Sequence, residues 1–514
     1  MNKVKILTRN QKIIRFFFLL GGSVSILWSL YFVKTTITMP YPLEFREGAS
    51  QVMTQMFLDG KNPYSFENQP LAYNVYSFSY SMVVFPFAKL LGNTLHVHRL
   101  VTFGFIFFSS FAGAWVLYRA GRSLSSALTC GAFIMIGGMA LGGLGSSPSS
   151  MGMFLFLAAI LIPFTRNFDR FGLHLSLVFT LFGFFTKMYF VLSFGIVASY
   201  LFLFVSKKKG VLYAASFLIL LLLSTILARI IFPLYFINAI NGNISNTFRT
   251  FENLYLQLWD LLTFFFPILI LTIFMLRLQK KQGFNIDSPM KSFNLIDWDK
   301  PVLEYETSYP LYAFICSFLA YVVILGSHVG NYLNYAYQMV IPTFFIWFFM
   351  RFEMKNVLPV IVVVFNLIYW QFTVLQPQML EQRMSPEWEK LYSYLEPNEK
   401  VLNTSIITSR LVEMGITAVD SGQTNYYYLM IPYAENPLFS VSYEDFYEHG
   451  QEYAESINNS IRNREYDLII TAKDVDIFYD LNLVEEYYSL TKNLILYMPQ
   501  TNQKWVVYIW KPKK

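Results

Sequence analysis

Long apolar runs separated by short polar stretches make up the first three quarters of the chain. The first run, Phe16 to Val33, is long enough to cross the hydrocarbon core of a bilayer. It follows a basic N-terminal stretch, and the polar residues after it offer no small-residue cleavage site. This pattern predicts an uncleaved first membrane span with a cytoplasmic N-terminus.

The later apolar runs are separated by short clusters of Lys and Arg. These clusters all fall on the cytoplasmic side if the run at residues 76–91, which contains Pro86 and Lys89, is an interfacial helix and not a span. The chain is therefore predicted to have about eleven transmembrane helices. Besides the first, the predicted spans are residues 98–118, 124–144, 149–164, 171–186, 188–205, 211–233, 256–276, 309–327, 336–350 and 357–374.

The composition changes to a soluble pattern after about residue 376. A helix is predicted at residues 386–395, and the alternating runs 494–498 and 505–510 predict a β-hairpin. The chain thus divides into a transmembrane domain, residues 1–376, and a small α/β domain, residues 377–514, on the outer face. A long outer loop, residues 34–97, follows the first span.

The composition supports a polytopic α-helical membrane protein. Hydrophobic residues make up 55%, charged residues only 14%, and mean hydropathy is +0.41. The net charge of +6 comes from clusters between apolar runs, so it reflects topology and does not indicate a nucleic-acid partner. Cys130 and Cys316 lie in separate apolar runs, which excludes a disulfide framework.

The first outer loop carries the most suggestive charges, Glu44, Arg46 and Glu47. If the segment is helical, the two carboxylates three residues apart share a face. A partly desolvated carboxylate there can act as general base on a hydroxyl. The alternative is a solvated loop with ordinary surface charges.

Several features together resemble the GT-C superfamily of membrane glycosyltransferases. They are the basic N-terminus with one span, the acidic loop, the Gly-x-Asn-Pro-Tyr turn at residues 60–64, and the span that opens with His98-Arg99-Leu100. The chain looks closest to polyprenyl-phosphate-sugar-dependent enzymes related to protein mannosyltransferases and the lipid A aminoarabinose transferase. Polar residues at 146–149, 185–189 and 328–335 also stand where such relatives keep residues facing the active site.

The resemblance implies an inverting transfer of a sugar from a polyprenyl phosphate to a glycan, lipid or protein acceptor on the outer face. No cofactor and no metal are expected. An acidic residue of the first loop would be the base. Glu47 aligns better with the acidic position before Gly in relatives, and Glu44 is close behind. Many relatives carry Asp-Glu or Asp-Asp where this chain has Arg46 before Glu47.

The departing phosphate needs positive charge, because negative charge builds up on it during the displacement. Lys187, between two apolar runs, either contacts this phosphate or snorkels to the interface. Arg99 has a similar alternative as an interfacial anchor. The candidate substrate-binding residues are Arg46, Lys61, Arg99, Lys187, His328, Tyr332 and Tyr335.

Other functions receive less support from the sequence. A transporter or lipid flippase would show paired ionisable residues at mid-membrane depth and repeated halves, and neither stands out. A scaffold protein that binds through its terminal domain is a third alternative. A metal site from His96, His98 and His328 is less favoured, and Asp474-Val-Asp476 is too short a match to indicate a nucleotide-sugar enzyme.

Overall fold

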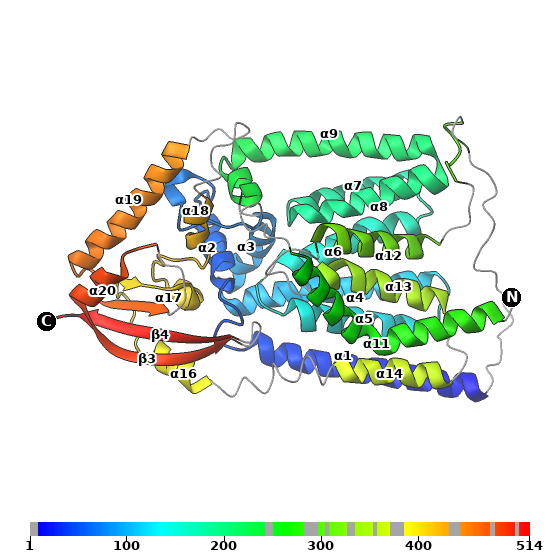
Figure 1. The fold of residues 1–514 in the computed structure, drawn as a ribbon, viewed down its shortest axis with the longest axis horizontal. Helices are drawn as coiled ribbons and strands as arrows, with labels where there is room; N and C mark the ends of the chain where they lie inside the picture. The colour runs from blue at the N-terminus through cyan, green and yellow to red at the C-terminus, as the bar shows by residue number, and fades with distance from the viewer. Residues whose placement is uncertain are drawn as a thin grey trace.

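A computed structural model of the protein shows a helical bundle joined to a smaller α/β unit (Figure 1). Two helices of the first outer loop, α2 (Glu47–Leu58) and α3 (Ser79–Leu91), lie where the two parts meet. The structure describes residues 9–146, 148–241, 250–281, 294, 297–303, 308–325, 335–352, 357–370, 385–430, 443–472, 478–498 and 503–514.

Five helices of the described residues are long and apolar enough to cross a membrane, and a bent pair within α11 (Phe251–Lys281) would make six. The five are Phe16–Ile37 of α1 (Arg9–Ile37), α4 (Leu95–Arg119), α6 (Pro148–Thr165), Met188–Val205 and α9 (Lys207–Ile231). Shorter helices complete the bundle: α5 (Leu124–Gly142), α7 (Arg170–Phe184), α12 (Tyr309–Ala320), α13 (Ile341–Arg351) and α14 (Val357–Trp370). The total of about eleven spans stays a prediction.

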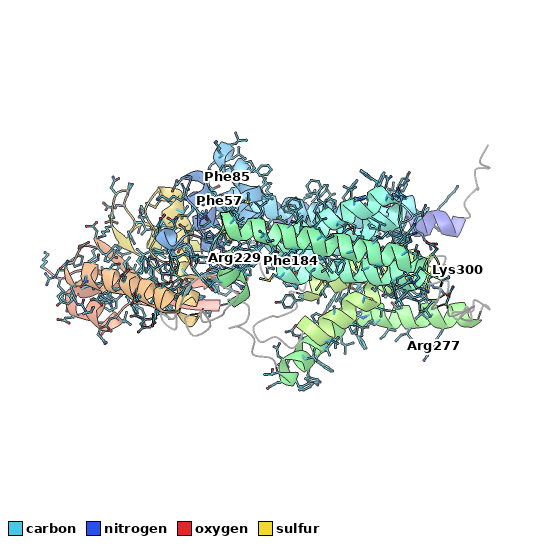
Figure 2. All side chains as sticks on the ribbon, turned by 90° about the horizontal axis from the view of Figure 1, so that it is seen from above. Phe57, Phe85, Phe184, Arg229, Arg277 and Lys300 are labelled. Carbon is cyan, nitrogen blue, oxygen red and sulfur yellow. The ribbon has the colours of Figure 1, made fainter. Side chains whose placement is uncertain are left out.

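The bundle exposes apolar side chains as a membrane protein does. On α9, Leu212, Leu222 and Ile230 are 59%, 61% and 72% exposed. Continuous apolar surface of this kind is unfavourable in water and favourable against lipid. The protein is therefore an integral membrane protein. Figure 2 shows Arg277 and Lys300 at the end of the bundle away from the α/β unit, where the charge pattern predicts basic residues.

The chain segment that connects α7 to the next apolar helix, α8 (Leu192–Tyr200), packs closely on α6. The span Met188–Val205 consists of η2 (Met188–Val191), α8 (Leu192–Tyr200) and η3 (Leu201–Val205). Gly152 of α6 lies so near Phe190 that a Cβ atom there would be 1.8 Å from the ring. The missing side chain lets η2, and Lys187 just before it, lie against the first turn of α6.

Aromatic residues join the first outer loop to the end of α9. The Tyr64 ring lies 5.5 Å from Phe232 and 5.6 Å from Tyr235, and Phe78 lies 4.5 Å from Phe232. Such contacts add to the apolar area that they bury. The loop is thus fixed on the bundle. Its other short helix is η1 (Phe66–Asn68), and the remaining short elements of the bundle are η4 (Ile237–Asn241), η5 (Tyr321–Leu325) and η6 (Ala336–Val340).

The α/β unit contains a sheet with strand order β1-β2-β4-β3. The first pair is parallel and the other two pairs are antiparallel. Leu494 lies opposite Val507, which confirms the predicted hairpin. The strands are β1 (Val401–Leu402), β2 (Leu468–Ala472), β3 (Tyr488–Met498) and β4 (Gln503–Pro512). The helices are α16 (Ser385–Tyr392), η9 (Ser405–Ile407), α17 (Thr408–Met414), α18 (Thr424–Met430), α19 (Tyr443–Arg462) and α20 (Leu481–Tyr487).

Candidate active site

A buried ion pair lies at the start of α2. Glu47 is the first residue of α2 and Arg99 lies in the second turn of α4; both side chains are 0% exposed. Arg99 donates from Nε to Glu47 Oε1 at 3.0 Å and from Nη2 to Oε2 at 2.8 Å. This two-point geometry is the strong form of an Arg–carboxylate contact. The pair fixes the first outer loop to the second long span.

Both members of this pair also form hydrogen bonds with backbone groups of the protein. Glu47 Oε2 accepts from the backbone N–H of Leu43 at 2.7 Å, and Oε1 accepts from that of Ser146 at 2.9 Å. Arg99 donates its remaining N–H groups to the backbone carbonyls of Thr36, Met39 and Tyr41. A carboxylate and a guanidinium so occupied hold four chain segments together.

Glu44 and Arg46 form a second, more accessible pair. α2 begins only at Glu47, so Glu44 precedes the helix and the two carboxylates do not share a helical face. Arg46 donates to both oxygens of Glu44, from Nη2 at 2.7 Å and from Nε. The side chains of Glu44 and Arg46 are 13% and 33% exposed. Arg46 Nη1 also donates to the Tyr76 hydroxyl at 3.2 Å.

Lys187 lies beside this second pair. Its Nζ donates to Ser149 Oγ at 2.7 Å and lies 4.4 Å from the centre of the Tyr76 ring. Burial, followed by the charge of Arg46, lowers the pKa of Lys187 from 10.5 to about 7, and Glu44 partly opposes this. Lys187, Arg46 and Glu44 therefore form one electrostatic cluster, and Tyr76 touches both cations.

Tyrosines surround the cluster on the side of η6. The Tyr189 ring lies 6.0 Å from Lys187 Nζ, and its hydroxyl donates to Gln338. Tyr335, one of the predicted substrate-binding residues, packs edge-on against Tyr189 with ring centres 4.8 Å apart. Tyr335 is thus linked to Lys187 through the ring of Tyr189.

The other predicted residues are distributed elsewhere. Lys61 is exposed in the turn after α2, and His328 and Tyr332 lie outside the described residues. His96 is exposed, whereas His98 is buried between Ser146 Oγ and Asn93 Oδ1, both at 2.9 Å. Within the described ranges no cluster of three or more His, Cys, Asp or Glu side chains is suited to a metal ion. Asp474 and Asp476 also lie outside these ranges.

The α/β unit contacts the acidic loop directly. Gln423 Oε1 accepts from the backbone N–H of Val75 at 2.7 Å, next to Tyr76, and Glu413 Oε1 accepts from that of Leu95 at 2.8 Å. These contacts link the unit to the backbone that carries Tyr76 and to the N-terminus of the Arg99 helix. Sequence reasoning did not identify Tyr76 or Gln423, because neither belongs to a charged motif.

Gly48 offers a test of the packing between α2 and the α/β unit. A Cβ atom at Gly48 would lie 2.7 Å from Thr408 Cβ of α17, whereas at Gly195 it would meet nothing within 4 Å. Gly48→Ala is expected to lower the free energy of unfolding by about 1–3 kcal/mol through overpacking. Gly195→Ala serves as the control and is expected to leave it within about 0.5 kcal/mol of wild type. Unfolding in mixed micelles measures both; equal stability of the two variants would contradict the contact.

Comparison with known proteins identifies the fold. No protein-family model matches the chain, and no curated protein matches it. The crystal structure of ArnT from Cupriavidus metallidurans bound to undecaprenyl phosphate aligns with a TM-score of 0.57 at 11% identity, covering 95% of this chain and 97% of that chain. The chain has the ArnT fold. The same protein in the apo state aligns over the same shares at 11% identity and a TM-score of 0.54.

ArnT is the lipid A aminoarabinose transferase, a GT-C enzyme. The predicted resemblance to this group is thus confirmed at the level of the fold, along nearly the whole chain. An identity of 11% is too low for the roles of single residues to be carried over. Those roles have to come from the geometry of the site described above.

Proposed function

We propose that the protein is a membrane glycosyltransferase that moves a sugar from a polyprenyl-phosphate donor to a glycan, lipid or protein acceptor. The observation that carries this proposal is the cluster of Glu44, Arg46 and Lys187, at the end of the bundle that meets the α/β unit, in a chain with the ArnT fold. One structure with this fold is that of ArnT bound to undecaprenyl phosphate. A carboxylate beside two cations suits a reaction that removes a proton and releases a phosphate.

Lys187 and Arg46 are the proposed phosphate-binding groups. Both are partly accessible, and both touch Tyr76, so they face one region. Arg99 is less suited, because its five N–H groups already donate to Glu47 and to backbone carbonyls. Lys61 makes only a backbone contact with Met56 among those described. The binding role of Tyr335, beside Tyr189, is retained as part of the proposal.

Glu44 is the proposed general base. Its carboxylate would take the proton of the acceptor hydroxyl while the acceptor oxygen forms a bond to the anomeric carbon. The bond from that carbon to the phosphate oxygen breaks, and polyprenyl phosphate leaves with the electron pair, so the anomeric configuration inverts. Each Glu44 oxygen keeps a lone pair beyond its bond to Arg46. Glu47 instead accepts four hydrogen bonds and is fully buried.

The proposed topology follows the charge pattern of the sequence. The N-terminus lies in the cytoplasm, whereas the loop at 34–97 and the domain at 377–514 face outward. Residues 1–376 form the catalytic transmembrane domain. The site therefore lies on the outer face, where a polyprenyl-linked sugar presents its phosphate at the membrane surface.

A direct assay tests the proposed function. The purified protein in nanodiscs is given a polyprenyl-phosphate-sugar fraction and cell-envelope acceptors, and release of polyprenyl phosphate is followed by mass spectrometry. Polyprenyl phosphate is expected to be released only when both an acceptor and the wild-type protein are present. Binding of the donor without release from any acceptor fraction, combined with movement of the lipid across the bilayer, would favour the flippase alternative instead.

The pKa of Lys187 predicts how donor affinity depends on pH. Above pH 7 the empty site holds a mostly neutral lysine, which must take up a proton to bind an anionic phosphate. The dissociation constant for a polyprenyl phosphodiester analogue, whose charge is constant, is expected to rise by up to about tenfold per pH unit above 7. Lys187→Arg stays charged and should show no such rise. A flat wild-type profile from pH 7 to 9 would contradict this role.

A further inference from the structure

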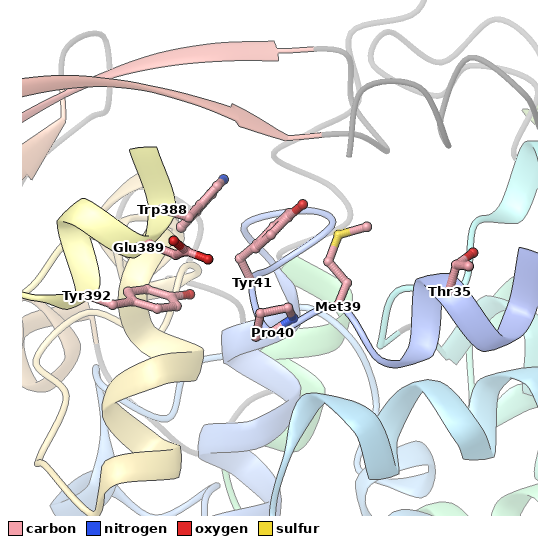
Figure 3. A pocket seen from close by; sticks show the side chains of 7 residues that line it. All are labelled: Thr35, Met39, Pro40, Tyr41, Trp388, Glu389 and Tyr392. Carbon is pink, nitrogen blue, oxygen red and sulfur yellow. The ribbon is translucent and has the colours of Figure 1, made fainter. Parts of the chain in front are cut away.

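A cavity of about 250 Å³ lies between the end of α1 and α16 (Figure 3). One wall is the end of α1 with the turn after it, through Tyr41. The other wall is Trp388, Glu389 and Tyr392 of α16. The proposed reaction uses none of these side chains.

The cavity lies at the end of a membrane-span candidate. The membrane-span candidate in α1 ends at Ile37, and the lining residues Thr35 and Met39 stand on either side of that end. The opposite wall belongs to the α/β unit. A ligand here would be at the depth of lipid head groups, which flank the hydrocarbon core.

Two polar groups in the cavity lack a side-chain partner among the residues that the structure describes. The Tyr392 hydroxyl is buried and has no hydrogen-bond partner. Glu389 is exposed and forms no ion pair in the described part of the chain, whereas Glu387 on the same helix pairs with Lys390 at 2.6 Å. Both unpartnered groups can accept hydrogen bonds. The stacked rings of Tyr41 and Trp388, 5.5 Å apart, supply an apolar wall.

The residues that line the cavity carry a net negative charge. Two cations are close, but each already has a carboxylate partner: Arg99 pairs with Glu47 at 2.8 Å and Arg410 with Glu413 at 3.9 Å. Glu389 is then the uncompensated charge among the described residues that line the cavity. A carboxylate at the edge of an aromatic site attracts a cation and repels an anion.

We propose that this cavity binds a ligand with an ammonium group, supplied by an amine-bearing lipid head group or by a small soluble amine. An ammonium has three N–H donors, which match the Glu389 carboxylate and the Tyr392 hydroxyl. The volume exceeds the roughly 150 Å³ of a cavity that holds benzene, so a small head group fits. The turn that would touch the ligand also carries the Met39 and Tyr41 carbonyls held by Arg99.

Lipid retention tests the proposal with the full chain. The protein is purified from nanodiscs of equal phosphatidylethanolamine and phosphatidylglycerol, and native mass spectrometry counts each bound lipid. The wild type should retain the amine lipid preferentially, and Glu389→Gln should lower that preference at least about threefold, as expected for a partly exposed ion pair. Glu387→Gln, on the same helix but outside the cavity lining, is the control and should match wild type.

A second arm separates the two sources of the amine. Ethanolamine is added to protein in phosphatidylglycerol nanodiscs, and saturation-transfer NMR reports its binding. Glu389-dependent binding in the lipid arm alone identifies a head-group site, and Glu389-dependent binding of ethanolamine identifies a small-amine site. If Glu389→Gln changes neither signal, or if the wild type prefers phosphatidylglycerol, the proposal is overturned.

Discussion

Glu44→Gln is expected to lower the rate of sugar transfer by about two to four orders of magnitude, the usual contribution of a general base. Glutamine keeps the shape of the side chain and one oxygen for Arg46, but it cannot accept the proton of the acceptor hydroxyl. Affinity for the lipid donor should change little, because Lys187 and Arg46 remain. The measurement is single-turnover transfer together with donor binding.

Glu67→Gln is the matched control for this variant. Glu67 lies in the same outer loop and is exposed, and it forms no ion pair with Arg46 or Lys187 among the described residues. It should keep wild-type transfer, which shows that loss of one loop carboxylate is not sufficient to stop the reaction. Full activity of Glu44→Gln would remove Glu44 as the base.

Breaking the buried Glu47–Arg99 pair is expected to have the second large effect, a loss of folding stability. Arg99→Ala leaves the Glu47 carboxylate buried without its cation, which is expected to cost about 3–5 kcal/mol of unfolding free energy. Glu47→Gln leaves Arg99 unpaired and should also be strongly destabilising. Denaturant unfolding in mixed micelles measures both variants.

This second prediction also distinguishes the two glutamates. If the role of Glu47 is structural, Glu47→Gln should lose transfer activity only in proportion to the folded protein that is lost. The double variant Glu47→Leu with Arg99→Leu should be more stable than either single Leu variant, because no buried charge is left unpaired. A Glu47→Gln protein of wild-type stability with transfer abolished would return the role of base to Glu47.

The apolar helices of the bundle were predictable because their signal is local. An apolar run of span length and the basic residues beside it are visible in the sequence. Each predicted span overlaps a described helical segment, and five or six of the described helices are long and apolar enough to cross a membrane. The hairpin was predictable for the same reason, since its two alternating strands are adjacent in the chain. Alternation and run length need no knowledge of tertiary contacts.

The different surroundings of the two carboxylates were not predictable, because they depend on contacts distant in sequence. Glu47 meets Arg99, 52 residues away, and Ser146, 99 residues away. The spacing of Glu44 and Glu47 suggested a shared helical face, but α2 begins at Glu47 and the two side chains take different partners. Tyr76 was missed because an uncharged aromatic residue in a loop carries no distinctive pattern.

A structure of the protein with bound undecaprenyl phosphate tests the central claim most directly. The phosphate is expected about 3 Å from Lys187 Nζ, as in a charge-assisted hydrogen bond, with Glu44 beside it and the Glu47–Arg99 pair unchanged. Phosphate density bound to Arg99 after the Glu47 pair has opened, or density that touches neither Lys187 nor Arg46, would contradict it.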